Sequence, residues 1–146
     1  MKRHPSIIPF SHEHHQNLIL AQLLKSNVRD YKGMPSSLSD KAAYALKCFE
    51  EGIRSHFEAE ESMLEYLSHY TELKPIATEI LSEHEELNNQ FLSLREPSIT
   101  VEKLNTLGHA LYNHIRKEDR ILFPLIESLC TDEEFQYIAA LHHPND

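Results

Sequence analysis

Two short motifs in this chain place a histidine four residues before a glutamate. They are His56 with Glu60 and His114 with Glu118. Residues four apart lie one above the other on a helix, so each motif can direct an imidazole and a carboxylate at the same point. Both side chains bind transition metals such as iron, manganese and zinc. The spacing therefore predicts two helices that each contribute a pair of metal ligands.

Histidines on two other predicted helices complete the candidate site. His84 interrupts the apolar stripe of the third helix, and the first helix carries histidines near its start. Counted from the chain breaks, the histidines of the four helices differ in depth by a few residues. At roughly 1.5 Å per residue this difference is only a few Å. We therefore expect the four histidines to lie in one layer of the protein.

The apolar pattern of the first helix selects among its histidines. In the other helices, core residues recur seven and ten positions from the histidine. Counted from His14, these positions hold Ala21 and Leu24, whereas from His15 they hold polar residues that belong in water. His14 is therefore the predicted ligand. His15 remains the alternative, because Leu18 follows it at the spacing seen in the third helix.

The two glutamates require compensating positive charge. Glu60 and Glu118 both fall on apolar stripes, and an unpaired buried carboxylate costs several kcal/mol. Four histidines and two carboxylates are too many ligands for one ion but suit two ions bridged by the glutamates. No thiolate belongs to the pattern, so soft metals are disfavoured. The predicted metal ligands are His14, His56, Glu60, His84, His114 and Glu118.

The elements that must position these residues are all predicted to be helices. Apolar residues recur at alternating steps of three and four, and no segment alternates with a period of two. Short connections make neighbouring helices antiparallel. We predict an all-α, up-down-up-down four-helix bundle in a single domain, residues 1–146, with its core at about 11–129. The predicted helices are 11–30, 39–69, 72–95, 99–129 and a short fifth helix at 132–142.

Turn residues mark the ends of these helices. Residues 31–38 form a predicted loop, and Pro97 marks a second break. Thr71 is a possible N-cap of the third helix, whose first turn tolerates Pro75. Thr131 and Glu134 have capping-box spacing at the start of the fifth helix. That helix could close the end of the bundle or form a dimer contact, so both monomer and homodimer are open.

Composition excludes several classes of protein. The formal charge of −9, without a Lys/Arg cluster, argues against nucleic acid and anionic membranes as partners. No apolar run reaches 18 residues and no signal peptide is visible. Cys48 and Cys130 lack a metal-binding or disulfide pattern and are interpreted as free thiols in the cytoplasm. No nucleophilic triad or phosphate loop is present, so an enzymatic role would depend on the metal.

The remaining histidines and acidic residues are interpreted as structural or surface groups. His12 and His15 are expected to face solvent or to hydrogen-bond a ligand. Glu61 and Asp119 are interpreted as surface charge, and the acidic runs 58–61 and 83–86 as solvated faces. The histidines assigned to surface or structural positions are His4, His69, His109, His142 and His143.

Four stretches of the chain resemble the hemerythrin-like (HHE cation-binding) family, over about residues 11–129. The resemblance implies a non-haem di-iron site, oxo- or hydroxo-bridged, held by the six residues named above, with zinc or manganese as the less favoured metals. It further implies a small ligand such as dioxygen, nitric oxide or peroxide, in sensing or a stress response. The matching stretches are SHEHHQNL at 11–18, HFEAEESML at 56–64, SEHEEL at 82–87 and HIRKEDRILFP at 114–124.

Two departures from the oxygen-carrying members of the family bear on function. The carriers place a second histidine one turn before the ligand of the third helix, where this chain has Ile80. They also use an aspartate five residues after the last histidine. Asp119 occupies that position, but Glu118 matches the wider family better. The resemblance therefore favours sensing over reversible transport, with an iron-dependent oxidoreductase or an iron store or donor for damaged iron centres as alternatives.

Overall fold

The protein consists of helices throughout the part that this computed structural model describes, residues 3–25, 35 and 37–141. Two five-residue segments, η1 and η3, are π-helical turns inside longer helices, and η2 is a short 3₁₀ turn. The elements are α1 (Ile8–Leu24), α2 (Leu38–Cys48), η1 (Phe49–Ile53), α3 (Arg54–Tyr66), η2 (Thr71–Leu73), α4 (Lys74–Ser93), α5 (Val101–Lys117), η3 (Glu118–Leu122), α6 (Phe123–Leu129) and α7 (Asp132–Ala140).

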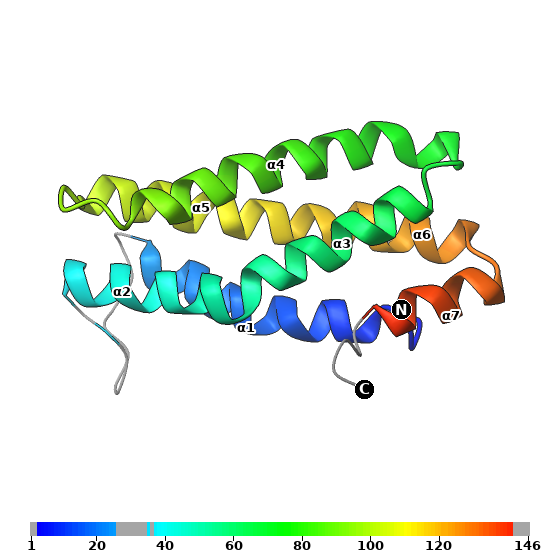
Figure 1. Ribbon diagram of the computed structural model, residues 1–146, viewed down its shortest axis with the longest axis horizontal. Coiled ribbons are helices and arrows are strands. Elements are labelled where there is room, and N and C mark those ends of the chain that lie inside the picture. Colours follow the sequence, from blue (N-terminus) through cyan, green and yellow to red (C-terminus); the bar gives the residue numbers. More distant parts are fainter. Residues whose placement is uncertain (1–2, 26–34, 36, 142–146) are drawn as a thin grey trace.

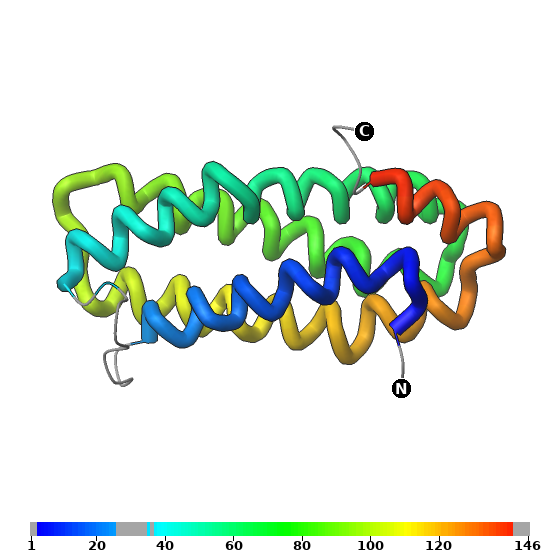
Figure 2. The backbone as a smooth tube through the Cα atoms, turned by 90° about the horizontal axis from the view of Figure 1, so that it is seen from below, coloured from blue at the N-terminus to red at the C-terminus, as the bar shows by residue number. Residues whose placement is uncertain are grey.

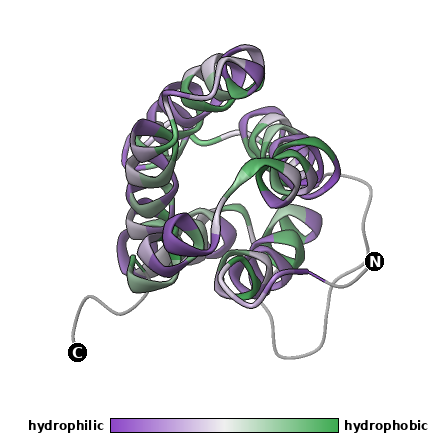
Figure 3. Ribbon diagram, turned by 90° about the vertical axis from the view of Figure 1, so that its right-hand side faces the viewer, coloured by the Kyte–Doolittle hydropathy of each residue, from purple (hydrophilic) through white to green (hydrophobic). Residues whose placement is uncertain are grey.

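These elements form four antiparallel rods. Rod 1 is α1, rod 2 is the continuous helix α2–η1–α3, rod 3 is α4, and rod 4 is the continuous helix α5–η3–α6. The rods run alternately in opposite directions along the long axis (Figure 1), and the end-on view shows them around a common interior (Figure 3). α7 folds back along the end of the bundle (Figure 2). The predicted all-α four-helix bundle with a short fifth helix is confirmed.

The predicted helix ends are correct to within a few residues, with some differences. α1 begins at Ile8, earlier than predicted, because Pro9 fits the first turn of a helix. The predicted continuation of this helix over 26–30 lies outside the described residues, as does most of the predicted loop 31–38. Thr71 does not cap α4: it opens the 3₁₀ turn, and its hydroxyl donates to Glu72. The capping box of Thr131 and Glu134 is present as predicted.

Two apolar clusters fill the interior, one towards each end of the bundle. The first includes Leu24, Phe49 and Phe91, and the second includes Phe10 and Phe123. α7 adds buried side chains to the second cluster and so closes that end of the bundle. His14, Glu60, His84 and Glu118 lie along the chain between residues of the two clusters, and His56 and His114 each stand directly before the last residue of the first cluster on their rod. A polar layer therefore crosses an otherwise apolar core, as the matched depths of the histidines predicted.

Among the described helices, none combines the length and the hydrophobicity that crossing a membrane requires.

Candidate metal centre

Six polar side chains, which we call the inner group, are buried at the middle of the bundle. Each is at most 3% exposed, although all are polar or ionisable. α1 provides one of them, rod 2 two, α4 one and rod 4 two. The structure thus brings together the whole predicted set: His14, His56, Glu60, His84, His114 and Glu118.

The inner group divides into two overlapping sets of potential metal ligands. His14 and His56 form one set with the two glutamates, and His84 and His114 form the other with the same glutamates. Within each set, one ligand atom per residue lies within 4.8 Å of the others. Because Glu60 belongs to both sets, as does Glu118, two ions could share these carboxylates. The arrangement is that of a dimetal centre.

The inner atoms approach one another without forming a satisfied hydrogen-bond network. The Nε2 of His14 lies 2.8 Å from a carboxylate oxygen of Glu118, and the Nε2 of His56 lies 3.0 Å from Glu60. Yet neither nitrogen makes a hydrogen bond of acceptable geometry. The same is true of the Nε2 of His114, one oxygen of Glu60 and both oxygens of Glu118. Buried polar atoms are rarely left unpaired, and here a metal would satisfy them.

The opposite nitrogen of every inner histidine is hydrogen-bonded to a carboxylate. We call these four acceptors the outer carboxylates. A carboxylate can only accept, so each Nδ1 carries a proton, and each Nε2 is the nitrogen that faces the interior and could bind a metal once its own proton is displaced. The pairs are His14 with Asp119 at 2.8 Å, His56 with Glu13 at 2.7 Å, His84 with Glu61 at 2.8 Å, and His114 with Glu83 at 2.8 Å.

These hydrogen bonds form a closed ring around the bundle. Each outer carboxylate stands next to an inner residue in the chain but serves a histidine on the following rod. Glu13 of rod 1 holds a histidine of rod 2, and Asp119 of rod 4 returns to rod 1. The interpretation of Glu61 and Asp119 as surface charge was therefore wrong. Glu13 and Glu83 were not identified either, although an acidic neighbour of an inner residue in every rod was a visible signal.

The electrostatic balance of the layer is set by its carboxylates. Burial by itself would lower the pKa of His14, but the neighbouring carboxylates, Asp119 first, raise it to about 12. Burial and neighbouring carboxylates oppose each other in the same way at the other three histidines. The net effect raises the pKa of His84 to about 10 and those of His56 and His114 to about 9. When no metal is bound, protonated imidazoles therefore balance the buried carboxylates, and a metal would take the place of these protons.

The carboxylates respond in the opposite direction. Burial would raise the pKa of Glu60, but the facing histidines, His56 first, hold it well below its usual value. Burial and the proximity of Glu60 would raise the pKa of Glu118, yet His114 and His14 lower it. Both glutamates are therefore ionised at neutral pH and available to bridge two cations.

π-helical turns accompany both histidine–glutamate motifs. η1 ends three residues before His56, and η3 begins at Glu118. Such turns are frequent at functional sites, where an extra residue changes the direction of the side chains beside it. In η3 the consecutive residues Glu118 and Asp119 face the inner group and the outer ring respectively. No feature of the sequence had predicted these turns.

The other histidines lie away from the inner group. His12 and His15 are exposed on α1, so the structure places His14, not its alternative, in the layer. His109 is exposed, and His69 is paired with Glu134 at the surface. His4 stacks on a phenylalanine of α7. The predicted surface pair at 142–143 lies outside the described residues.

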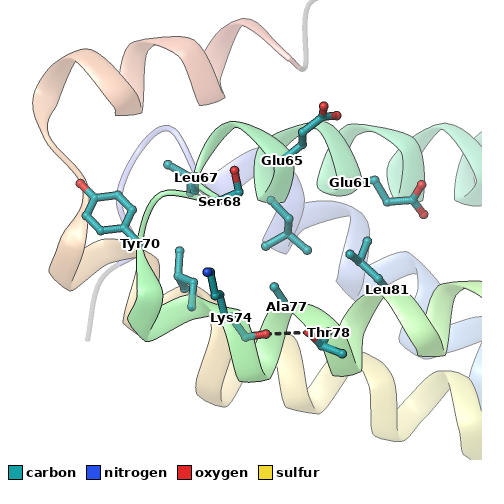
Figure 4. A pocket seen from close by; sticks show the side chains of 11 residues that line it. Glu61, Glu65, Leu67, Ser68, Tyr70, Lys74, Ala77, Thr78 and Leu81 are labelled. Carbon is teal, nitrogen blue, oxygen red and sulfur yellow. Dashed lines mark hydrogen bonds between the residues drawn. The ribbon is translucent and has the colours of Figure 1, made fainter.

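A surface groove of about 430 Å³ between α3 and α4 borders the outer ring. Figure 4 shows Glu61 at one end of the groove and Tyr70 at the other. Apolar side chains such as Leu64 and Leu81 contribute to its lining, and no member of the inner group does. Solvent in this groove therefore meets an outer carboxylate but not the inner atoms.

Comparison with known proteins agrees with this geometry. The family model described as the hemerythrin HHE cation binding domain matches residues 6–126, most of the chain. Neither the curated proteins nor the solved structures contain a match to this chain. The matched segment contains the entire inner group and all four outer carboxylates. The chain belongs to the hemerythrin HHE cation-binding domain family.

Proposed function

We propose that this protein holds two iron ions in the inner group and that the ion pair binds or reacts with a small ligand. The ligand class is dioxygen, nitric oxide or peroxide, in sensing or a stress response. The observation that carries the proposal is the set of buried inner atoms without hydrogen-bond partners, shared between two overlapping ligand sets. Nitrogen and oxygen donors without thiolate suit iron.

The protein would contribute orientation and a dry environment to such a centre. Each ligand set would hold one ion with its two histidines and the two glutamates that both sets share. The ring of Phe57 stacks on His84 with centroids 4.1 Å apart, and Phe123 stacks on His14 at 5.3 Å. These walls exclude water from the donor atoms. When bound, the iron pair supplies redox chemistry and open coordination positions that the side chains alone lack.

A buried apolar residue supports an open position rather than saturation by histidine. Ile80 stands one turn before His84, where oxygen carriers have a further histidine. It is fully buried and packs in an apolar cluster. An isoleucine cannot bind a metal, so the ion held by His84 and His114 would keep room for a small exogenous ligand. This feature favours ligand sensing or reaction over saturated, reversible transport.

The test is to load metal-free protein with ferrous iron without oxygen and then to admit air. We expect two irons per chain and new near-ultraviolet absorption bands on exposure to air. His14→Ala should lose at least one of the two irons, because His14 lies in the inner group. His15→Ala, a change at the exposed neighbouring position, should keep both. Equal iron content in these two variants would contradict the ligand assignment.

The same experiment separates the alternatives. Two bound zinc or manganese ions per chain with little iron would overturn the choice of iron and retain the dimetal centre. Bands that disappear on degassing would indicate that the protein is a reversible oxygen carrier. Repeated turnover with a reductant would identify an iron-dependent oxidoreductase, and ready loss of iron to an acceptor would identify an iron store or donor.

A further inference from the structure

The N-terminal residues before the matched domain make a specific set of contacts with rod 4. Arg3 lies outside the family match, which begins at residue 6. Its guanidinium forms an ion pair with Glu127 at 3.0 Å, and the other oxygen of that carboxylate accepts the backbone N–H of His4 at 2.6 Å. The ring of His4 stacks on Phe135 of α7, with centroids 3.7 Å apart. Arg3 is therefore held in one place beside η3.

Arg3 supplies a hydrogen bond that rod 4 cannot make for itself. Its Nη2 donates to the backbone carbonyl of Asp119 at 3.1 Å. In a regular helix that carbonyl would accept from Phe123, but in η3 the N–H of Phe123 donates to Glu118 instead. The next possible donor along the π turn is residue 124, which is Pro124 and has no N–H. Because of the π turn and the proline, this carbonyl lacks its usual helical donor, and Arg3 donates to it instead.

The carbonyl belongs to the residue that orients His14. The carboxylate of Asp119 accepts the Nδ1–H of His14 at 2.8 Å. A second route reaches the same histidine, because the guanidinium of Arg3 lies 5.7 Å from the centre of the Phe123 ring, and that ring stacks on His14. Arg3 thus touches both residues that fix the orientation of His14. No such contact runs from Arg3 to the described pair of His84 and Glu61.

We propose that Arg3 is a positioning residue for one half of the dimetal centre, the half that contains His14. It completes the hydrogen bonding of η3 and so fixes the carboxylate of Asp119, which in turn aims the Nε2 of His14 inward. The proposal rests on the dimetal function proposed above. It adds a residue outside the matched domain and makes the two metal positions unequal in their dependence on the N-terminal segment.

The experiment measures loss of cobalt from the full chain loaded with two cobalt(II) ions, with excess chelator. Asp119→Asn marks the kinetic phase of the His14 half, and Glu83→Gln marks the phase of the other half. We expect Arg3→Met to accelerate the first phase about three- to tenfold and to leave the second unchanged. The effect should be smaller than the roughly 10- to 100-fold loss typical when a partner of a metal ligand is removed, because Arg3 acts through Asp119.

Two further variants make the result specific. Arg3→Met combined with Asp119→Asn should accelerate cobalt loss by less than the product of the two single-variant factors, because both changes act on the same hydrogen bond to His14. Glu127→Gln keeps Arg3 but removes its ion pair, so it should accelerate the same phase by a smaller factor. Arg95→Met removes an exposed arginine from a comparable ion pair with Glu50 and serves as the control.

A spectroscopic measurement distinguishes positioning from general stability. In the cobalt protein, the Nδ1–H proton of His14 should exchange faster with solvent in Arg3→Met, while that of His114 should not change. Equal rates in Arg3→Met and wild type, or acceleration of both phases together with a lower unfolding temperature of the metal-free protein, would overturn the role of Arg3. If the wild type fails to bind two cobalt ions, the dimetal function itself is overturned.

Discussion

Each inner histidine has two nitrogens with separate tasks. The Nδ1 donates to an outer carboxylate, and the Nε2 faces the buried glutamates. A carboxylate behind an imidazole fixes its tautomer and raises its basicity as a ligand. The outer carboxylates differ in their own support: Glu83 is paired with Lys117, whereas Glu61 is 41% exposed beside the groove. Ligand strength should therefore differ from one histidine to the next.

Glu61 offers a direct test of the outer ring. Glu61→Gln keeps the size of the side chain but removes the charge behind His84, so metal affinity should fall about tenfold or more. Glu65 lines the same groove one turn further along α3 and is exposed. Glu65→Gln should therefore leave affinity unchanged. Cobalt titration of the metal-free proteins measures both, and equal affinities for the two variants would show that Glu61 is only surface charge.

At the scale of helices, close contact with α5 fixes the position of α1, the helix that carries His14. The backbone of α1 passes directly over Gly108 of α5, which has no side chain to keep the two helices apart. A Cβ atom built on Gly108 would lie 2.7 Å from the carbonyl oxygen of Ala21 and 3.1 Å from the Cβ of Leu24. Because the nearest atom is backbone, α1 itself would have to move to accept a methyl group there.

Gly108→Ala should therefore lower the free energy of unfolding, by about 1–3 kcal/mol, the usual cost of overpacking. Gly52 is the matched control. No heavy atom lies within 4 Å of a Cβ built there, so Gly52→Ala should raise the free energy of unfolding by up to about 1 kcal/mol through helix propensity. Urea unfolding of the metal-free proteins compares them. A Gly108→Ala protein as stable as wild type would mean that α1 does not pack as described.

The long helices could be predicted from sequence because their apolar residues keep a helical period. The same period identified the inner group, since His56 and Glu60 interrupt an otherwise apolar stripe. Matched depth along four helices predicted the single layer. These inferences succeed because burial and helical geometry act within one helix at a time.

Contacts between helices were harder to predict. The partner of Asp119 is on α1, more than a hundred residues away, so no local spacing reveals it. A π turn of five residues is too short to produce a recognisable apolar period in the sequence. The role of Gly108 depends on how closely α1 passes, which the sequence alone does not determine. The outer ring could have been inferred only by noticing an acidic neighbour beside an inner residue in every rod.

At the scale of the whole molecule, a charged layer divides the core between two apolar clusters. The layer contains two buried glutamates, and the outer carboxylates add further negative charge around it. When no metal is bound, protons on the histidines supply the compensating charge. A metal bound in the inner group would therefore compete with protons for the same four nitrogens, and pH should control both the affinity and the stability of the protein.

The direction of the pH effect follows from the pKa values. The histidine pKa values rise on folding from 6.5 to between about 9 and about 12. Their contribution to the stability of the metal-free protein is therefore complete below about pH 6.5 and is lost as the pH rises through these folded-state values. The pKa values of Glu60 and Glu118 fall below 4.5, so their contribution is present above pH 4.5 and is lost in more acidic solution.

We therefore expect the metal-free protein to lose stability between about pH 6.5 and pH 9, while bound metal becomes harder to displace because fewer protons compete with it. The difference in unfolding temperature between the loaded and metal-free proteins should widen across this interval, since ligand binding stabilises the folded state in proportion to its affinity. Thermal unfolding of both forms at several pH values measures this difference. His109→Ala, at an exposed position on α5, should show the same widening as wild type. A constant difference from pH 6.5 to pH 9 would mean that metal and protons do not share the inner histidines.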